Sequence, residues 1–203
     1  MRERLIETAI DIFGAKGLDG ASTREIASAA DTSMSMITYH FGGKEGLYLA
    51  AADHIFTVME SQLRTQDMSA PGDAASNEER IDYVRQMVRA AARFMLSEPS
   101  ARYAQFIVRE QVSPVPAVQD IARQHVGPII GGLAGQLTAL RPTMSSDDAR
   151  ATAFLLFGMA VHLRLSRPRL LDAFNVTDVS PDLHDRLLTQ VDEIVRSTLE
   201  ALE

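Results

Sequence analysis

Residues 33–41 combine hydrogen-bonding and apolar side chains at the spacing of a helix. Hydroxyl, phenol and imidazole groups on one face of a helix can hydrogen-bond to a polar partner, while an apolar opposite face packs on neighbouring helices. The first set comprises Ser33, Ser35, Thr38, Tyr39 and His40, and the second comprises Met36, Ile37 and Phe41. The pattern therefore predicts a binding surface on one side of a short helix.

Residues for other kinds of chemistry are missing from the sequence. There is no Cys, which excludes thiolate nucleophiles, thiolate metal sites and disulfides. The 5 His and 27 acidic residues form no His-Glu-x-x-His and no Glu-x-x-His pair. A Gly-rich phosphate loop and a Gly-x-Ser-x-Gly elbow are also absent. We therefore expect no catalytic residue, no metal and no cofactor, and the sequence does not predict an enzyme.

The composition is that of a folded globular protein, with 46% hydrophobic and 23% charged residues. A net charge of -7 argues against non-specific coating of nucleic acid, although it allows a small basic surface. The first residues lack the apolar core of a signal peptide, and the longest apolar run, residues 151–161, is too short to span a bilayer. We expect a cytoplasmic protein without a membrane partner.

Apolar residues recur at helical spacing along nearly the whole chain, which predicts an all-α fold. Residues 64–77 have no apolar period and predict a loop, and a second loop is expected after Pro168, through Asn175 to Ser180. A kink or break is expected at Gly127-Pro128. The expected helices cover approximately residues 2–16, 23–30, 34–40, 44–63, 81–95, 103–110, 117–140, 147–166 and 181–202.

The first three of these helices match a helix-turn-helix, in which the later helix enters the major groove of DNA. The run Ser22-Thr23-Arg24-Glu25 is typical of a capping box that starts the second helix, and Ser33 can cap the third. Residues 33–41 would then be a recognition helix, with their polar face toward base edges and their apolar face on the first two helices.

Residues 3–50 resemble the TetR family of repressors. The resemblance rests on FGAKG at residues 13–17, on the segment 22–30, and above all on ITYHFGGKEGLY at residues 37–48. That family has an aromatic pair on the recognition helix and a Lys-Glu at the start of the next helix, and Tyr39, Phe41, Lys44 and Glu45 stand at those positions. The resemblance implies that phosphates are held by Thr23, Tyr39 and Lys44, and that the groove is faced by Ser33, Ser35, Thr38 and His40.

One departure concerns the turn, where the family usually has Gly and this chain has Asp31. Asp tolerates unusual backbone angles and caps helices well, so the turn is expected to form, but without a phosphate contact. Residues 1–47 contain five basic and seven acidic side chains. We therefore expect DNA binding through a few well-placed contacts.

In the C-terminal half, FIVREQVSP at residues 106–114 and VGP at residues 126–128 are similar to the TetR subgroup with a CecR-type C-terminal domain. The resemblance implies a ligand pocket and a homodimer formed by the helices at residues 147–166 and 181–202. The apolar character of the first and the amphipathic pattern of the second agree with this. Two-fold symmetry predicts a palindromic operator.

Five residues are candidates for the ligand pocket, although each is also explained as core: Met87, Tyr103, Phe106, Phe154 and His162. For His162, which lies among apolar residues, a buried hydrogen-bonded core position is favoured over a ligand contact. Four arginines could favour an anionic effector if one turned inward, but solvated positions are favoured for all of them: Arg89, Arg93, Arg102 and Arg109.

The sequence thus predicts a DNA-binding domain at residues 1–47 and an effector-binding and dimerisation domain at residues 48–203. The expected function is that of a repressor, a homodimer that binds double-stranded operator DNA and is released by a small-molecule effector. The helix at residues 44–63 would couple the two domains. One alternative is a helical small-molecule-binding protein or enzyme that has lost DNA binding, and another is an activator or DNA-bending member of the same fold.

Overall fold

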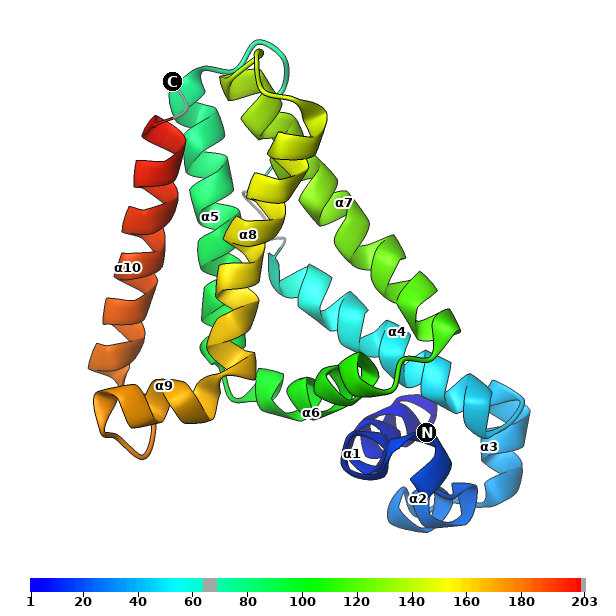
Figure 1. Ribbon diagram of the computed structural model, residues 1–203. Helices are drawn as coiled ribbons and strands as arrows, with labels where there is room; N and C mark the ends of the chain where they lie inside the picture. Colours follow the sequence, from blue (N-terminus) through cyan, green and yellow to red (C-terminus); the bar gives the residue numbers. More distant parts are fainter. Residues whose placement is uncertain (64–68, 202–203) are drawn as a thin grey trace. The chain divides into compact units, whose positions relative to one another are not determined.

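The computed structural model describes residues 1–63 and 69–201 (Figure 1). Over these residues the chain forms ten helices and no strand, which confirms the all-α prediction. None of the described helices has the length and apolar character needed to cross a membrane. The helices are α1 (Arg2–Gly20), α2 (Thr23–Ala29), α3 (Met34–Phe41), α4 (Lys44–Leu63), α5 (Asn77–Leu96), α6 (Pro99–Val112), α7 (Pro116–Leu140), α8 (Ser146–Leu165), α9 (Arg167–Phe174) and α10 (Pro181–Glu200).

Contacts within the chain divide it into two compact units. Unit 1 comprises Met1–Met59 and Glu98–His125, and unit 2 comprises Glu60–Ser97 and Val126–Glu203. The helices α4 and α7 each begin in unit 1 and end in unit 2. These units are defined by contacts between residues. The predicted boundary between residues 47 and 48 instead separates a DNA-binding domain from an effector-binding domain, and it stays a prediction.

In unit 1, α1 packs against both α2 and α6. Phe13 of α1, Tyr48 of α4 and Phe106 of α6 form a buried aromatic cluster, in which the Tyr48 ring lies 4.8 Å from each of the other two ring centroids. Gly14 allows the close approach of α1 and α6, because a Cβ atom there would lie 3.3 Å from Gln105 Cβ. The helix α6 is therefore an integral part of unit 1.

In unit 2, α5 packs against α8 and α10, and its apolar face supplies much of the core. The buried Arg80 of α5 donates hydrogen bonds to Gln136 Oε1 of α7 at 2.7 Å and to the carbonyl oxygens of Gly72 and Asp73 at 2.8 and 3.0 Å. These bonds satisfy a buried guanidinium and hold the loop before α5 against the helices.

The structure corrects several expected boundaries. Of the kink or break predicted at Gly127-Pro128, the break is wrong, because α7 continues through Pro128, and the kink stays a prediction. The helix expected at residues 103–110 begins earlier, at Pro99, a position where a missing N–H costs no helical hydrogen bond. The helix α9 was not predicted, whereas the loop expected through Asn175 to Ser180 is confirmed. Residues 64–68 of the other predicted loop, and Leu202 of the last predicted helix, lie outside the described residues.

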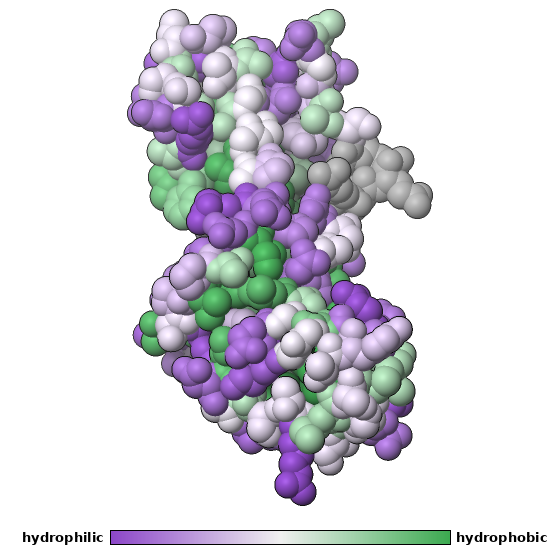
Figure 2. Space-filling model, turned by 90° about the vertical axis from the view of Figure 1, so that its right-hand side faces the viewer, coloured by the Kyte–Doolittle hydropathy of each residue, from purple (hydrophilic) through white to green (hydrophobic). Residues whose placement is uncertain are grey.

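The protein surface is mixed in character. On the face shown in Figure 2, hydrophobic residues are uncovered in patches among hydrophilic ones. Large apolar side chains are exposed on several helices, and these include Met34, Val108, Val112, Phe154, Leu155 and Ile194. Single exposed apolar residues are ordinary, but adjacent ones on a helix are typical of a surface that binds another molecule.

Candidate functional site

The helix α2 begins as the sequence predicts. Ser22 is its N-cap, and the Ser22 hydroxyl accepts a hydrogen bond from the Glu25 N–H at 3.1 Å. The second bond of the expected capping box does not form, since the Glu25 carboxylate is paired with Lys16 Nζ. Ile26 and Ala27 are buried beneath α2 and fix it on its neighbours.

The turn between α2 and α3 forms with Asp31 in the left-handed region, at φ 48°. The Thr32 N–H donates to the Ala27 carbonyl at 2.9 Å, which closes the turn. Asp, like Asn, is one of the few non-Gly residues that visit this region readily. The expectation that Asp31 tolerates an unusual backbone conformation is confirmed.

The helix α3 separates a polar face from an apolar one. Ile37 is fully buried, whereas Ser33, Ser35, Thr38 and Tyr39 are exposed. The exposed fraction of Tyr39 is 80%, which is large for a tyrosine. Side chains of this kind can reach a partner that lies along the helix, and the polar and apolar faces follow the predicted division.

Gly42 and Gly43 end α3 at positive φ values of 75° and 142°. The Gly42 N–H donates to the Thr38 carbonyl at 2.9 Å, as in a left-handed helix cap. The same joint explains Gly46, because a Cβ atom there would lie 1.8 Å from the Phe41 carbonyl oxygen. Glycines therefore let α4 start directly against the end of α3.

Three other predicted contact residues are partly buried: Thr23, His40 and Lys44. Lys44, the first residue of α4, donates from Nζ to the Ala21 carbonyl at 3.3 Å. An ammonium group has two further donors, so this bond leaves it able to bind an anion. For His40, Nε2 is buried without a hydrogen-bond partner among the described residues. The roles of these side chains toward DNA stay predictions.

Two basic residues that were not predicted as part of the site lie near α3. The Arg2 guanidinium carbon lies 5.4 Å from the centroid of the Phe41 ring, and Arg4 Nη2 donates to the Asp31 carbonyl at 3.0 Å. The only signal in the sequence is that two arginines stand in the first turn of α1. Their spacing does not show that one contacts the residues before α3 and the other contacts its last residue.

A buried polar network joins α4 to α6 within unit 1. Tyr48 Oη donates a hydrogen bond to Glu110 Oε1, and the Val115 N–H donates to Glu110 Oε2 at 3.0 Å. Burial raises the pKa of Tyr48 well above its usual value, and the hydrogen bond to the Glu110 carboxylate raises it further. The Glu110 side chain thus holds α4 and the start of α7 together.

We expect Tyr48→Phe to lower the free energy of unfolding at pH 7 by about 2 kcal/mol, because the Glu110 carboxylate loses a donor. The raised pKa of Tyr48 also makes its contribution to stability depend on pH. The contribution is fully present below the unfolded pKa of 10.0 and is lost as the pH rises above it, because the phenol then ionises in the unfolded chain but not in the folded one. The difference between the two proteins should therefore shrink above that pH. Urea unfolding at a series of pH values measures it.

Tyr39→Phe is the matched control, since it removes the same hydroxyl from an exposed tyrosine of unit 1. We expect it to change the free energy of unfolding by less than about 0.5 kcal/mol. Equal losses in the two variants would contradict a role for the buried network.

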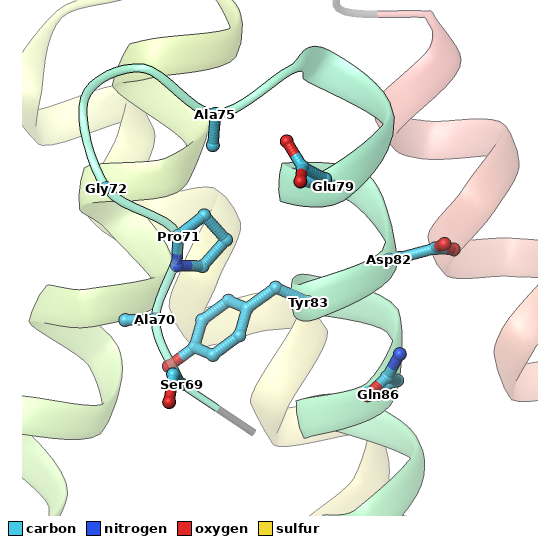
Figure 3. A pocket seen from close by; sticks show the side chains of 9 residues that line it. All are labelled: Ser69, Ala70, Pro71, Gly72, Ala75, Glu79, Asp82, Tyr83 and Gln86. Carbon is cyan, nitrogen blue, oxygen red and sulfur yellow. The ribbon is translucent and has the colours of Figure 1, made fainter. Parts of the chain in front are cut away.

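Unit 2 contains a cavity of about 300 Å³ between α4, α5 and α7. Its lining residues are mainly apolar and comprise Glu60, Leu63, Ala70, Tyr83, Met87, Pro128, Ile129 and Gly132. A second, more polar pocket of about 450 Å³ shares Ala70 and Tyr83 with it. Figure 3 shows the Tyr83 ring reaching from α5 toward the loop at Pro71, with Glu79, Asp82 and Gln86 along α5.

Of the five residues predicted for the pocket, Met87 lines this cavity. Tyr103 and Phe106 belong to unit 1, and both are buried on α6, which packs on α1. Phe154 is 66% exposed on α8, and His162 is also exposed, so the expected core position of His162 is wrong. Whether any of the five contacts a ligand stays a prediction. Three of the four arginines are held by hydrogen bonds within their own units: Arg89, Arg102 and Arg109.

Two family descriptions match the chain. Residues 5–51 match the bacterial regulatory proteins of the tetR family, and residues 80–202 match the C-terminal domain of the HTH-type transcriptional dual regulator CecR. Together they cover the helix-turn-helix and nearly all of the helices of unit 2.

Related proteins and solved structures agree with these matches. The HTH-type transcriptional dual regulator CecR of Shigella flexneri is 33% identical over 159 residues, which cover 76% of this chain and 69% of CecR. The HTH-type transcriptional repressor NicS of Pseudomonas putida is 32% identical over 76 residues, or 36% of this chain and 35% of NicS.

Among solved structures, a putative transcriptional regulator from Pseudomonas aeruginosa PAO1 has a TM-score of 0.68 at 20% identity, with 100% of this chain and 93% of that chain covered. AibR, in complex with isovaleryl coenzyme A and operator DNA, has a TM-score of 0.67 at 16% identity, with 95% and 96% covered. These two likenesses show a shared fold. The relatives are transcriptional regulators and not enzymes, as the sequence predicted. Because both family descriptions match and CecR is 33% identical, the chain belongs to the TetR family of transcriptional regulators and carries a CecR-type C-terminal domain.

Proposed function

We propose that this regulator is a cytoplasmic repressor that binds a palindromic operator as a homodimer and leaves it when a small molecule binds unit 2. The observation that carries the proposal is the division of α3, where Ile37 is fully buried and four hydrogen-bonding side chains are exposed: Ser33, Ser35, Thr38 and Tyr39. NicS is named as a repressor, which supports this direction of regulation. In functional terms, residues 1–47 would bind DNA and residues 48–203 would bind the effector and the second subunit.

At the DNA, we assign phosphate contacts and base contacts to different side chains. Tyr39, Lys44 and Thr23 would hold phosphates, and Lys44 adds its charge to the free N–H groups at the start of α4. The groove would be faced by Ser33, Ser35, Thr38 and His40, whose groups can donate to or accept from base edges.

The second subunit would bind α8 and α10. Phe154 and Leu155 of α8 are 66% and 70% exposed, and Ile194 of α10 is 49% exposed. Such apolar side chains gain stability when a second copy covers them, at roughly 25 cal/mol per Å² removed from water. Two copies joined in this way bind two half-sites with an affinity that one copy lacks.

The effector would occupy the cavity of unit 2. Glu60 and Leu63, which line it, are in the last turn of α4, the helix that begins at Lys44. A ligand shifts an equilibrium only by its difference in affinity for the two states, so it must contact an element that moves. AibR is solved with isovaleryl coenzyme A, which shows that this fold can accept a small molecule. Tilting of α4 is the coupling we propose.

Substitutions on α3 and α4 test the two kinds of contact. We expect Tyr39→Ala and Lys44→Ala to weaken binding to all duplexes, because each removes a phosphate contact, and Lys44→Ala, which also removes a cation, to reduce the salt slope by about one. Thr38→Ala and His40→Ala are expected to change the preferred sequence instead. Selection from a randomised duplex pool, followed by anisotropy titrations at several salt concentrations, measures both. If the two pairs behaved alike, the assignment of contacts on α3 would be wrong.

Two other functions give different results in simple assays. A helical protein or enzyme that had lost DNA binding would produce no salt-sensitive gel shift with DNA upstream of its own coding region. An activator or DNA-bending member of the fold would bind this DNA, but reporter expression would fall in a strain that lacks the gene. A repressor predicts a shift and increased expression.

A further inference from the structure

The turn before α3 carries a negative charge where the proposed DNA surface begins. The Asp31 side chain is 99% exposed, and Asp31 lies three residues before Met34, the first residue of α3. An exposed carboxylate within a Debye length of a phosphate, roughly 10 Å at 0.1 M salt, repels it. A helix-turn-helix with Asp at this position therefore needs a nearby positive charge.

Arg4 of α1 supplies such a charge. Its Nη2 atom donates to the Asp31 carbonyl at 3.0 Å and lies 4.0 Å from the Asp31 carboxylate. The Arg4 side chain is 51% exposed, so part of the guanidinium still faces solvent. A guanidinium has five N–H donors and keeps its charge at any physiological pH, so it can hold the turn and an anion together.

The other basic side chains of this region are placed differently. Lys16 is paired with Glu25 at 2.5 Å, Lys44 is directed to the Ala21 carbonyl, and Arg24 is exposed on α2. Arg2 lies over the Phe41 ring, at the opposite end of α3 from the turn. Because acidic residues outnumber basic ones in residues 1–47, the position of each cation matters more than the total charge.

We propose that Arg4 is a positioning residue of the DNA-binding surface, which neutralises Asp31 and offers its remaining N–H groups to a phosphate of the duplex beside the turn. Arg4 and Asp31 then act as a pair, in which Asp31 stands where the family usually has glycine and Arg4 balances its charge. This inference rests on the proposed DNA binding, and it adds a contact from α1 to those assigned to α2, α3 and α4.

The test uses four variants of the full chain: Arg4→Ala, Arg4→Lys, Asp31→Asn and the double variant Arg4→Ala/Asp31→Asn. Asn adopts the left-handed conformation and removes only the charge. The probe is a duplex selected from a randomised pool by the unmodified protein, and its affinity is measured by anisotropy between about 0.05 and 0.3 M salt. Arg123→Ala, an exposed arginine on α7 in unit 1, is the matched control, and thermal melting checks that each variant is folded.

We expect Arg4→Ala to weaken binding about tenfold near 0.1 M salt and to reduce the salt slope by about one, whereas Arg123→Ala changes neither. Arg4→Lys keeps the charge and should retain affinity within about threefold of the unmodified protein. Asp31→Asn should strengthen binding about twofold when Arg4 is present and about fivefold in the Arg4→Ala background, because the carboxylate is then no longer neutralised.

The possible failures are distinct. If the unmodified protein bound no duplex, the proposed function itself would fail, and this inference with it. If the unmodified protein bound DNA but Arg4→Ala bound equally well, only the role of Arg4 would be overturned. Equal effects of Asp31→Asn in both backgrounds would overturn the coupling. A loss of affinity in Arg4→Lys as large as in Arg4→Ala, with an unchanged salt slope, would show that Arg4 only ties the turn.

Discussion

Gly46→Ala is expected to abolish specific DNA binding and to lower the free energy of unfolding by about 3 kcal/mol. The added Cβ atom would lie 1.8 Å from the carbonyl oxygen of Phe41, which is backbone and cannot rotate away. Either α3 or the start of α4 must then move. Both carry proposed DNA contacts, so the change in structure and the loss of affinity should occur together. Urea unfolding and anisotropy titration measure the two effects.

Gly135→Ala is the matched control, because Gly135 is also helical and a Cβ atom there would meet nothing within 4 Å. Ala has the higher helix propensity, so this variant should be stabilised by up to about 1 kcal/mol. A Gly46→Ala protein that was as stable as the unmodified one would show that the junction of α3 and α4 is looser than the structure indicates.

Leu155→Glu is expected to convert the proposed dimer to a monomer and to weaken operator binding at least about a hundredfold. Leu155 is 70% exposed on α8, so a glutamate there costs the single subunit little. In a dimer, two such carboxylates would be removed from water without a partner, which is strongly unfavourable. Sedimentation velocity gives the mass in solution, and a titration with the selected duplex gives the affinity.

Val112→Glu serves as the control for this experiment. Val112 is 82% exposed at the end of α6 in unit 1, so the substitution has the same chemistry at a position outside the proposed interface. We expect it to leave the mass unchanged. A monomeric unmodified protein, or a Leu155→Glu protein that remained dimeric, would contradict the assignment of the interface to α8.

The sequence predicts most accurately those features that depend on residues close together in the chain. The bounds of α4 agree with the expected residues 44–63, and the two faces of α3 follow from the alternation around Ile37. Ser22 caps α2 because the hydroxyl and the N–H that it accepts from are three residues apart. Within a single helix or turn, spacing alone fixes which groups can meet.

Features that depend on distant residues were harder to predict. Periodicity shows that Phe106 is buried but not which helix covers it, and the structure places it beside Tyr48 and not at the cavity. The helix α9 is only eight residues long and has no buried residue, so its apolar pattern is too short to predict a helix. The partnership of Arg4 with Asp31 joins residues 27 positions apart, a distance at which spacing carries no information.

The positions of the tyrosines also have a practical consequence. The chain has four tyrosines and no tryptophan, so its intrinsic ultraviolet emission comes from phenol rings alone. Tyr39 stands exposed on α3, and Tyr83 lines the cavity of unit 2. Subtracting the emission of Tyr39→Phe or Tyr83→Phe from that of the unmodified protein would give the signal of each of these two phenols alone. Occupancy of the two places could then be followed separately without a label.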